Sequence, residues 1–382
     1  MVEWKKLGEV CSNVYAGGKP ITKHSEYYDG NIPWIRSGEV DFNVIKTAER
    51  NITEEGYKNS SAKKIRKKSV VMAMTGATVA KTAVVEIETT ANQSVCAMET
   101  DENIIGYKYL YYFLAKNYFT IKSSAQGALT SINLAMIKDI LIPIPSLSEQ
   151  ERIVGILDTF TASIDNIKAQ IEQRRKQYEH YRNTLLTFNK DDDSVEWKTL
   201  GEVSYKICSG GTPLRENKEF FNGTIPWLRT QEVDWRDVYD TEIKITQEAI
   251  AKSSAKLIPE NCVIIAMYGA TAGKSCINKI PLTTNQACCN LQINDSTCLY
   301  KYVYHYVCRE YNKLKALGEG SQNNIRVQKI KSYNIHIPSL ARQQEIVSIL
   351  DTFEASITNL EAQLEQRQKQ YEYYREKLLT FE

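Results

Sequence analysis

The stretch "MYGATAGKS" (267–275) is the part of the chain that most resembles a catalytic or binding motif. A phosphate-binding loop reads G-x-x-x-x-G-K-[ST], because its glycine-rich turn points backbone N–H groups at phosphate oxygens and its lysine reaches the outer phosphates. Gly269 and Gly273 are one residue too close for that pattern, and the following "CINKI" reads as a strand rather than a helix. An NTPase that uses Gly269 to Ser275 is therefore a minor alternative.

Other catalytic signatures are missing from the sequence. The nine cysteines and four histidines form no CxxC pair and no cluster at the spacing of zinc ligands, so we expect reduced, structural thiols. No Ser/His/Asp or Cys/His arrangement is recognisable by spacing. The glycine-rich cofactor loop and the [ND]-P-P-aromatic stretch of an adenine methyltransferase are also missing. We expect no catalysis, no metal and no cofactor.

The chain consists of two copies of one unit, shifted by 193 residues. No gap is needed between 2–189 and 195–382, and the copies are joined by a short acidic turn at 191–194. "IPWIRSGEVD" returns as "IPWLRTQEVD", and "AMTGATVAK" returns as "AMYGATAGK". Ala80 stands where the second copy has Gly273, which is a further reason to reject a nucleotide site.

Length and composition fit a globular protein of two or three domains. The chain has 382 residues, of which 42% are hydrophobic and 25% are charged. It contains no apolar run of about 18 residues and no signal-peptide core, so we expect a cytoplasmic protein. The formal charge of +2 neither demands nor excludes a nucleic-acid partner.

The last forty residues of each copy are nearly identical and have a helical pattern. Apolar residues recur in alternating steps of four and three over about five heptads, the a/d seam of a coiled coil. Arg174 and Arg367 occupy the polar seam position and are interpreted as register markers. We expect an antiparallel pair; the alternative is that each helix packs on its own domain. The seam residues are Ile153, Leu157, Phe160, Ile164, Ile167, Ile171, Ile346, Leu350, Phe353, Ile357, Leu360 and Leu364.

The divergent parts read as mixed α and β structure. Short β-branched runs such as "SVVMAM" are bounded by turn residues, and 106–125 and 299–317 have the pattern of aromatic-rich amphipathic helices. Their tyrosines are expected to pack in the core rather than stack on bases. The predicted fold is α+β with an internal pseudo-two-fold repeat. Its expected parts are a first domain (1–148), a helix (149–188), a linker (189–194), a second domain (195–341) and a second helix (342–382).

Polar and basic residues gather at the predicted turns, and several change between the copies. Arg, Asn and Gln are the side chains that read guanine and adenine edges in the major groove. A loop that keeps its frame while these residues change is expected of two domains that read two different DNA sequences; the alternative is a solvated loop that drifts. Lys81 and Lys274, which follow the shared glycine turn, suit a DNA phosphate. The amides of Asn92-Gln93 and Asn285-Gln286 are also shared.

The candidate DNA-binding residues are therefore numerous and lie at corresponding places in the two copies. In the first copy they are Lys19, Thr22, Lys23, Arg36, Lys63, Lys64, Thr75, Lys81, Thr130 and Asn133. In the second copy they are Thr212, Arg215, Arg229, Lys256, Tyr268, Lys274, Gln322, Asn323, Asn324 and Arg326.

The order of these motifs resembles the specificity subunit of Type I restriction-modification systems. The motifs are G-G-x-P, I-P-W-[IL]-R, S-S-A-K, G-A-T-x-x-K, N-Q and then I-P-S-L before a long helix, all of them twice. The resemblance implies two target recognition domains that read the halves of a split DNA sequence, with the helices setting the spacer. It does not carry over base-reading residues, because these have no motif common to the family.

The resemblance also implies partners. These are double-stranded DNA, two modification subunits that use S-adenosylmethionine to methylate adenine, and restriction subunits with ATP-driven translocase and nuclease activity. In this interpretation any ATP belongs to a partner subunit. The alternative function is a two-headed scaffold whose domains bind proteins and whose coiled coil sets their separation.

Overall fold

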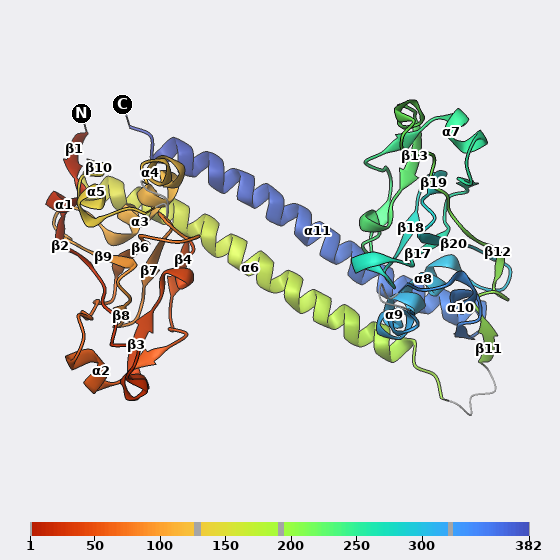
Figure 1. Ribbon diagram of the computed structural model, residues 1–382, viewed down its shortest axis with the longest axis horizontal. Coiled ribbons are helices and arrows are strands. Elements are labelled where there is room, and N and C mark those ends of the chain that lie inside the picture. Colours follow the sequence, from red (N-terminus) through yellow and green to blue (C-terminus); the bar gives the residue numbers. More distant parts are fainter. Residues whose placement is uncertain (1, 126–130, 190–194, 320–323, 382) are drawn as a thin grey trace. The chain divides into compact units, whose positions relative to one another are not determined.

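The computed structural model describes residues 2–125, 131–189, 195–319 and 324–381 (Figure 1). The chain divides into two compact units: Met1–Lys168 with Ala362–Glu382, called unit 1, and Ala169–Glu361, called unit 2. Each unit thus contains one globular domain and segments of both long helices. Among the described residues, no helix has the length and apolarity needed to cross a bilayer.

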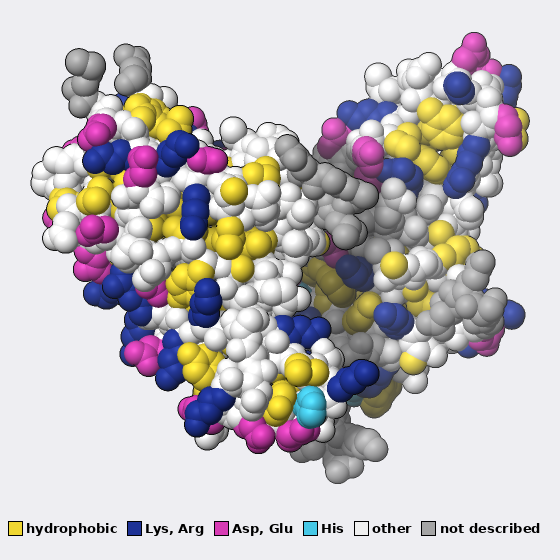
Figure 2. Space-filling view, turned by 60° about the vertical axis from the view of Figure 1, so that its left-hand side comes forward, with side chains coloured by type: hydrophobic (Ala, Val, Ile, Leu, Met, Phe, Trp, Pro, Cys, Tyr) yellow, Lys and Arg dark blue, Asp and Glu magenta, His cyan; other side chains and the backbone are white. Residues whose placement is uncertain are grey.

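The surface carries charges of both signs. On the face drawn in Figure 2, lysine and arginine side chains are mixed with acidic and uncharged ones rather than gathered in one continuous patch. This distribution agrees with the formal charge of +2.

The domain of unit 1 is built on a five-stranded sheet of order β2-β9-β6-β7-β4. Its central strand β6 (Ser69–Ala73) is buried along its whole length, which explains the continuous apolar run in the sequence. A three-stranded sheet β5-β3-β8 and the pair β1-β10 complete the domain. The other strands are β1 (Glu3–Lys6), β2 (Cys11–Ala16), β3 (Tyr28–Ile35), β4 (Asn43–Ile45), β5 (Asn51–Ile52), β7 (Thr82–Val85), β8 (Thr90–Ala91), β9 (Val95–Thr100) and β10 (Leu141–Ile144).

Short helices surround these sheets. The longest is α3 (Tyr107–Lys116), which packs against β6 and β7. Tyr109 and Tyr112 of α3 are buried, so the expectation that these tyrosines pack in the core is confirmed. The remaining helices are α1 (Leu7–Val10), η1 (Ser25–Tyr27), η2 (Ser37–Glu39), α2 (Glu54–Lys58), α4 (Tyr118–Ser123) and α5 (Leu134–Lys138).

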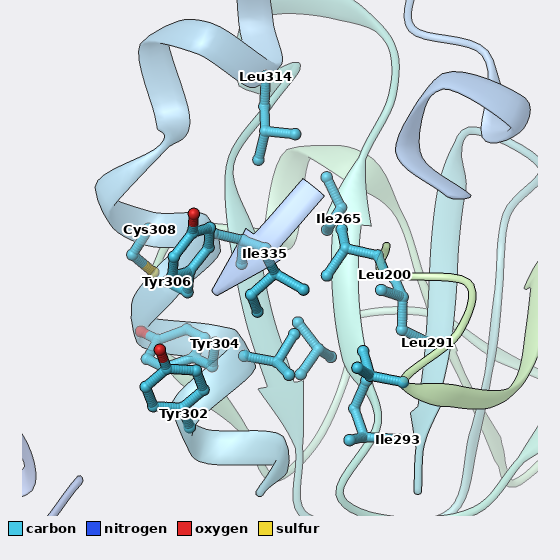
Figure 3. Close-up of a cluster of buried hydrophobic side chains, with 14 of the residues drawn as sticks. Leu200, Ile265, Leu291, Ile293, Tyr302, Tyr304, Tyr306, Cys308, Leu314 and Ile335 are labelled. Carbon is cyan, nitrogen blue, oxygen red and sulfur yellow. The ribbon is translucent and has the colours of Figure 1, made fainter. Parts of the chain in front are cut away.

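The domain of unit 2 repeats this architecture, with the strand orders β12-β20-β17-β18-β14 and β15-β13-β19-β16 and the pair β11-β21. Figure 3 shows Tyr302 and Tyr306 of α8 in one buried cluster with Ile265, Leu291 and Ile335. The strands are β11 (Glu196–Thr199), β12 (Ser204–Ser209), β13 (Ile225–Leu228), β14 (Asp237–Val238), β15 (Lys244–Ile245), β16 (Leu257–Ile258), β17 (Val263–Ala266), β18 (Ser275–Asn278), β19 (Leu282–Thr284), β20 (Cys288–Ile293) and β21 (Asn334–Ile337). The helices are η3 (Lys218–Phe221), η4 (Thr230–Glu232), α7 (Gln247–Ala251), η5 (Gly269–Thr271), α8 (Tyr300–Arg309), α9 (Tyr311–Ala316) and α10 (Val327–Lys331).

The two long helices are α6 (Leu147–Leu185) and α11 (Leu340–Leu378), each of 39 residues. Each begins two residues before the expected position and ends a few residues earlier. In unit 2, Arg175 pairs with Glu361, and Tyr181 stacks on Phe353 with ring centroids 5.1 Å apart. A step forward along α6 is thus a step back along α11, so the predicted antiparallel pairing is confirmed. Residues 190–194 of the expected linker lie outside the described residues.

Each unit also holds the end of the long helix that belongs to the other copy. In unit 1, Lys116 of α3 donates to the backbone oxygen of Leu379 at 3.0 Å. In unit 2, the corresponding Arg309 of α8 donates to the backbone oxygen of Leu186 at 2.5 Å. The two contacts therefore join corresponding residues, with the helix of one copy held by the domain of the other in each case.

Burial along the seam is uneven. The buried seam residues are Ile153, Leu157, Ile164, Ile167, Ile171, Ile346 and Leu350. The half-buried seam residues are Phe160, Phe353, Ile357, Leu360 and Leu364. The side chains of Arg367 and Arg174 lie over the rings of Phe160 and Phe353, respectively, so arginine stems cover these rings.

Candidate nucleic-acid interface

Two adjacent glycines hold the loop after β2 tightly between two other turns. The backbone N–H of Gly17 donates to Val95 at 2.9 Å, and that of Gly18 donates to Ala91 at 2.7 Å. A Cβ on Gly18 would lie 2.1 Å from the carbonyl carbon of Ser61, and one on Gly17 would lie 2.3 Å from the oxygen of Ala91. Only glycine fits such an approach. The loop at 17–23 is thereby fixed beside the turns at 60–64 and 92–94.

Two more backbone hydrogen bonds extend this arrangement. Met74 donates to Ser94 at 2.8 Å, and Ile132 donates to Met74 at 2.9 Å. The turn between β6 and β7 and the loop before α5 therefore lie beside the first three segments. The loop cluster, defined as 17–23, 60–64, 74–81, 92–94 and 131–133, brings together the described candidates Lys19, Thr22, Lys23, Lys63, Lys64, Thr75, Lys81 and Asn133.

Unit 2 builds the same frame from the corresponding residues. Gly211 donates to Thr284 at 2.9 Å, Met267 donates to Ala287 at 2.8 Å, and Ile325 donates to Met267 at 2.9 Å. The indole N–H of Trp227 donates to Gly211, as that of Trp34 does to Gly18, so the shared tryptophans belong to the scaffold. The second loop cluster (210–216, 253–257, 267–274, 285–287 and 324–326) contains Thr212, Arg215, Lys256, Tyr268, Lys274, Asn324 and Arg326.

The shared lysines of the glycine turns are already paired with carboxylates. Lys81 donates to Asp41 at 2.5 Å, and Lys274 donates to Asp234 at 2.5 Å. Lys274 also lies 4.3 Å from the ring centroid of Trp235. Each ion pair joins the glycine turn to the loop that contains the aspartate. A DNA phosphate would have to compete with that aspartate for the lysine.

Arg36 and Arg229 likewise form internal ion pairs. Arg36 donates to Glu49, and Arg229 donates to Glu242. These four residues lie at corresponding positions, so the pair belongs to the common fold. The role of both arginines in DNA binding stays a prediction, and their guanidinium groups already have an acidic neighbour.

Several candidates that differ between the copies have polar side chains with internal partners. Asn133 accepts a hydrogen bond from the backbone N–H of Met136 at 2.9 Å and caps α5, which leaves its amide N–H₂ group for another partner. Arg326 is highly exposed, and its Nε lies 3.2 Å from Glu319. Thr130, Gln322 and Asn323 lie outside the described residues.

Two exposed glutamines at corresponding positions, Gln93 and Gln286, are not among the DNA-binding candidates predicted from the sequence. They lie in the turns 92–94 and 285–287, which contact the neighbouring segments of each loop cluster. The preceding asparagines have a structural role, since Asn92 accepts from the N–H of Ser94 at 3.1 Å and Asn285 accepts from that of Ala287 at 3.2 Å. The signal that could have identified the glutamines was present: both copies share them within segments that otherwise differ.

The segment resembling a phosphate-binding loop adopts a different structure. Gly269 has φ +77° and begins the short helix η5, and β18 follows at Ser275. The expectation of a strand after this turn is confirmed. A phosphate-binding loop requires a helix N-terminus there, so this segment does not have the geometry of a nucleotide site.

Where the pKa of a cysteine thiol is shifted, it is raised, so none of these thiols is an activated nucleophile. All nine are free, and burial raises the pKa of Cys96 and of Cys262 to about 12. Such thiols stay protonated at neutral pH and are poor nucleophiles. Seven of the nine are buried and pack in the core.

A polar cluster around the buried His305 joins α8 to both long helices within unit 2. The His305 side chain is fully buried, its Nε2 lies 3.1 Å from Asp351, and its Nδ1 lies 3.1 Å from the hydroxyl of Tyr178. That hydroxyl donates to Glu354 at 2.9 Å. His305, Asp351 and Glu354 are close enough to hold a metal ion. The carboxylates, however, face opposite ring nitrogens and Lys301 already pairs with Asp351, so internal hydrogen bonds account for the cluster.

Comparisons with known proteins agree on one family. The family model described as "Type I restriction modification DNA specificity domain" matches residues 1–174 and 193–369. The Escherichia coli "Type I restriction enzyme EcoR124I/EcoR124II specificity subunit" is 36% identical over 402 residues, which cover 100% of this chain and 94% of the relative. The Methanocaldococcus jannaschii "Type I restriction enzyme MjaIX specificity subunit" is 26% identical over 94% of this chain and 88% of its own length.

A solved structure shares the fold. The crystal structure of a Type I restriction-modification S subunit from M. genitalium matches with a TM-score of 0.67 and 14% identity, covering 100% of this chain and 97% of that one. The fold of this chain thus occurs in a known specificity subunit. The chain belongs to the family of Type I restriction-modification specificity subunits.

Proposed function

We propose that this protein is the DNA-recognition subunit of a Type I restriction-modification complex and that it has no catalytic activity of its own. Each globular domain reads one half of a bipartite DNA sequence, and α6 with α11 sets the separation between the halves. The complex would contain two modification subunits that methylate adenine, and restriction subunits would join it. Family membership supports these partners.

One observation carries the proposal. Both loop clusters have the same backbone frame, held by equivalent hydrogen bonds, but present different side chains at equivalent places. Lys19 and Thr22 correspond to Thr212 and Arg215, Thr75 corresponds to Tyr268, and Asn133 corresponds to Arg326. A backbone frame that is the same in both domains, with different hydrogen-bonding side chains on it, is suited to reading two different sets of base edges.

The spacer role rests on the long helices. Each has 39 residues and therefore spans about 58 Å at 1.5 Å per residue. Their seam packs inside both units, so a change in helix length would be passed to the separation of the domains. This part of the proposal predicts that the helices determine the spacer and the domains determine the half-sites.

Methylation of a randomised duplex library tests the proposal. The chain is combined with the modification subunits of its own system and S-adenosylmethionine, and methylated adenines are located by sequencing. We expect a single split motif with two defined halves and an undefined spacer. Methylation without a split motif would refute bipartite reading, and a complex that forms with these subunits but neither binds nor methylates any sequence would favour the protein-binding scaffold. The modification subunits alone are the control.

A further inference from the structure

The loop clusters contain exposed residues of two kinds, those that differ between the copies and those that are shared. Most shared residues have a structural task. Gly17 and Gly18 allow a close backbone approach, Asn92 stabilises its own turn, and Lys81 pairs with Asp41. The fold thus explains their presence in both copies without any role in binding.

Gln93 and Gln286 are shared without such a task. Both side chains are exposed, and the amide of Gln93 makes no hydrogen bond to any residue that the structure describes. Within the described part of the chain, Gln286 has one hydrogen-bond partner, the hydroxyl of Thr212, which donates to its Oε1. Since Lys19 replaces Thr212 in the first copy, this bond is not what the two glutamines have in common.

Each of these glutamines lies in a turn between two other segments of its loop cluster. The turn at 92–94 lies against the Gly17-Gly18 loop on one side, and Ser94 accepts from Met74 beside the exchanged Thr75 on the other. The same contacts surround Gln286, between the loop that bears Thr212 and the turn that bears Tyr268. A shared amide is thus flanked in both units by side chains that differ.

The chemistry of the amide indicates its partner. A glutamine side chain has one acceptor oxygen and a donor N–H₂ group, which match N6 and N7 of adenine in the major groove. In the proposed function, loop residues that differ between the copies contact bases that differ between the half-sites. A loop residue shared by both copies should therefore contact a feature that both half-sites have. We propose that Gln93 and Gln286 each contact an adenine that is present in both half-sites. This inference rests on the proposed function and names two residues of the same site that read a common base.

The experiment uses the complete methyltransferase complex and the randomised library, with Gln93→Ala and Gln286→Ala tested separately. Gln93→Ala should reduce discrimination at one adenine position of one half-site by about tenfold, the order expected for a bidentate contact, and leave the other half-site unchanged. Gln286→Ala should do the same in the other half-site. Because both side chains are exposed, the melting temperatures should stay at the wild-type value.

Gln93→Glu and Gln286→Glu provide a second test. Glutamate keeps the acceptor but loses the donor, so preference at the affected position should shift from adenine towards cytosine, whose N4 donates. Lys63→Ala and Lys256→Ala are the matched controls. They change another exposed residue pair shared by the two clusters and should lower methylation of all sequences alike, as loss of a phosphate contact does.

The failures of the two ideas are distinguishable. If the wild-type complex gives no split motif, the proposed function itself is wrong. If it gives a split motif that both alanine variants reproduce with unchanged discrimination, only the adenine contact is wrong. A uniform loss over all sequences, like that of the lysine controls, would also overturn it and would assign the glutamines to the DNA backbone.

Discussion

The guanidinium carbon of Arg174 lies 5.8 Å from the ring centroid of Phe353, which also stacks on Tyr181 at 5.1 Å. Unit 1 contains the same arrangement with the copies exchanged. Arg367 lies 5.7 Å from the centroid of Phe160, which stacks on Tyr374 at 5.2 Å. The polar residue in each seam therefore has a specific aromatic partner on the other long helix.

We expect Arg174→Ala to lower the free energy of unfolding by about 1 kcal/mol, because it removes a cation–π contact and the aliphatic cover of a half-buried ring. Arg367→Ala should have a similar effect. Denaturant unfolding measures both, and a double-mutant cycle with Phe353→Leu isolates the contact. Strict additivity of Arg174→Ala and Phe353→Leu would show that the two residues do not interact.

Replacing Gly18 or Gly211 with alanine should disrupt the loop cluster of the unit concerned. The new Cβ would lie 2.1 Å from the backbone at Ser61 in unit 1 and 2.2 Å from that at Ser254 in unit 2. Both variants should have a lower melting temperature than the wild type, and each should lose recognition of one half-site. Gly38→Ala is the matched control, since a Cβ there meets no atom within 4 Å. A Gly18→Ala protein with the wild-type melting temperature and motif would contradict the tight packing described above.

Glu354→Gln should make the protein more stable at neutral and alkaline pH. Burial raises the pKa of Glu354 above its ordinary value of 4.5, so the stability that this group contributes is present below about pH 4.5 and is lost as the pH rises through the folded-state pKa. Glutamine keeps the acceptor for Tyr178 and carries no charge. The difference in melting temperature between variant and wild type should therefore grow from pH 4 to pH 8.

Glu365→Gln, in the same helix, is the control for that titration. The pair with Lys369 lowers the pKa of Glu365, so this carboxylate stabilises the fold above pH 4.5 and loses that effect as the pH falls. The variant should become slightly less stable than wild type as the pH rises. Equal pH profiles for the two variants would rule out the buried environment as the cause.

Insertion of one heptad in both long helices should lengthen the DNA spacer and leave both half-sites unchanged. The insertions belong between Lys168 and Ala169 in α6 and between Glu361 and Ala362 in α11, where the two units meet in the chain, so the packing inside each unit is kept. Seven residues add about 10 Å, or about three base pairs. Insertion in α6 alone should destabilise the pair because it breaks the register. A changed half-site in the double insertion would contradict the proposed division of roles.

Lys274→Ala and Arg326→Ala should have different effects on DNA recognition. Loss of Arg326 should relax one base position at a cost of about 1–3 kcal/mol, whereas loss of Lys274 should weaken binding to all sequences and reduce the salt dependence. Asp234→Asn removes the carboxylate that pairs with Lys274 and should strengthen binding to all sequences. Affinities of the complex for matched and mismatched duplexes at several salt concentrations measure these effects. An Asp234→Asn complex that binds no more tightly would show that Lys274 does not face a phosphate.

The duplication, the mixed α/β domains and the two long helices with their apolar seam can be predicted from the sequence alone, which also favours antiparallel pairing of the helices. These features follow from patterns that are local or repeated: the 193-residue shift aligns the copies, and steps of four and three residues require an apolar helical seam. The apolar pattern does not define the helix ends, because the start of α6 at Leu147 depends on polar side chains outside that pattern. Gln150, for example, accepts from the N–H of Gly106 and so joins the first turn of α6 to the domain.

Which side chains of the candidate site lack an internal partner depends on tertiary contacts. Lys81 and Asp41 are forty residues apart in the chain but 2.5 Å apart in space, and no local pattern predicts such a pair. Gly18 is needed because the backbone at Ser61 lies against it, which is a fact of packing. The position of Gln93 among residues that differ between the copies likewise depends on the backbone contacts of the turn at 92–94. Periodicity fixes elements, whereas the use of each polar group depends on neighbours that only the folded chain brings together.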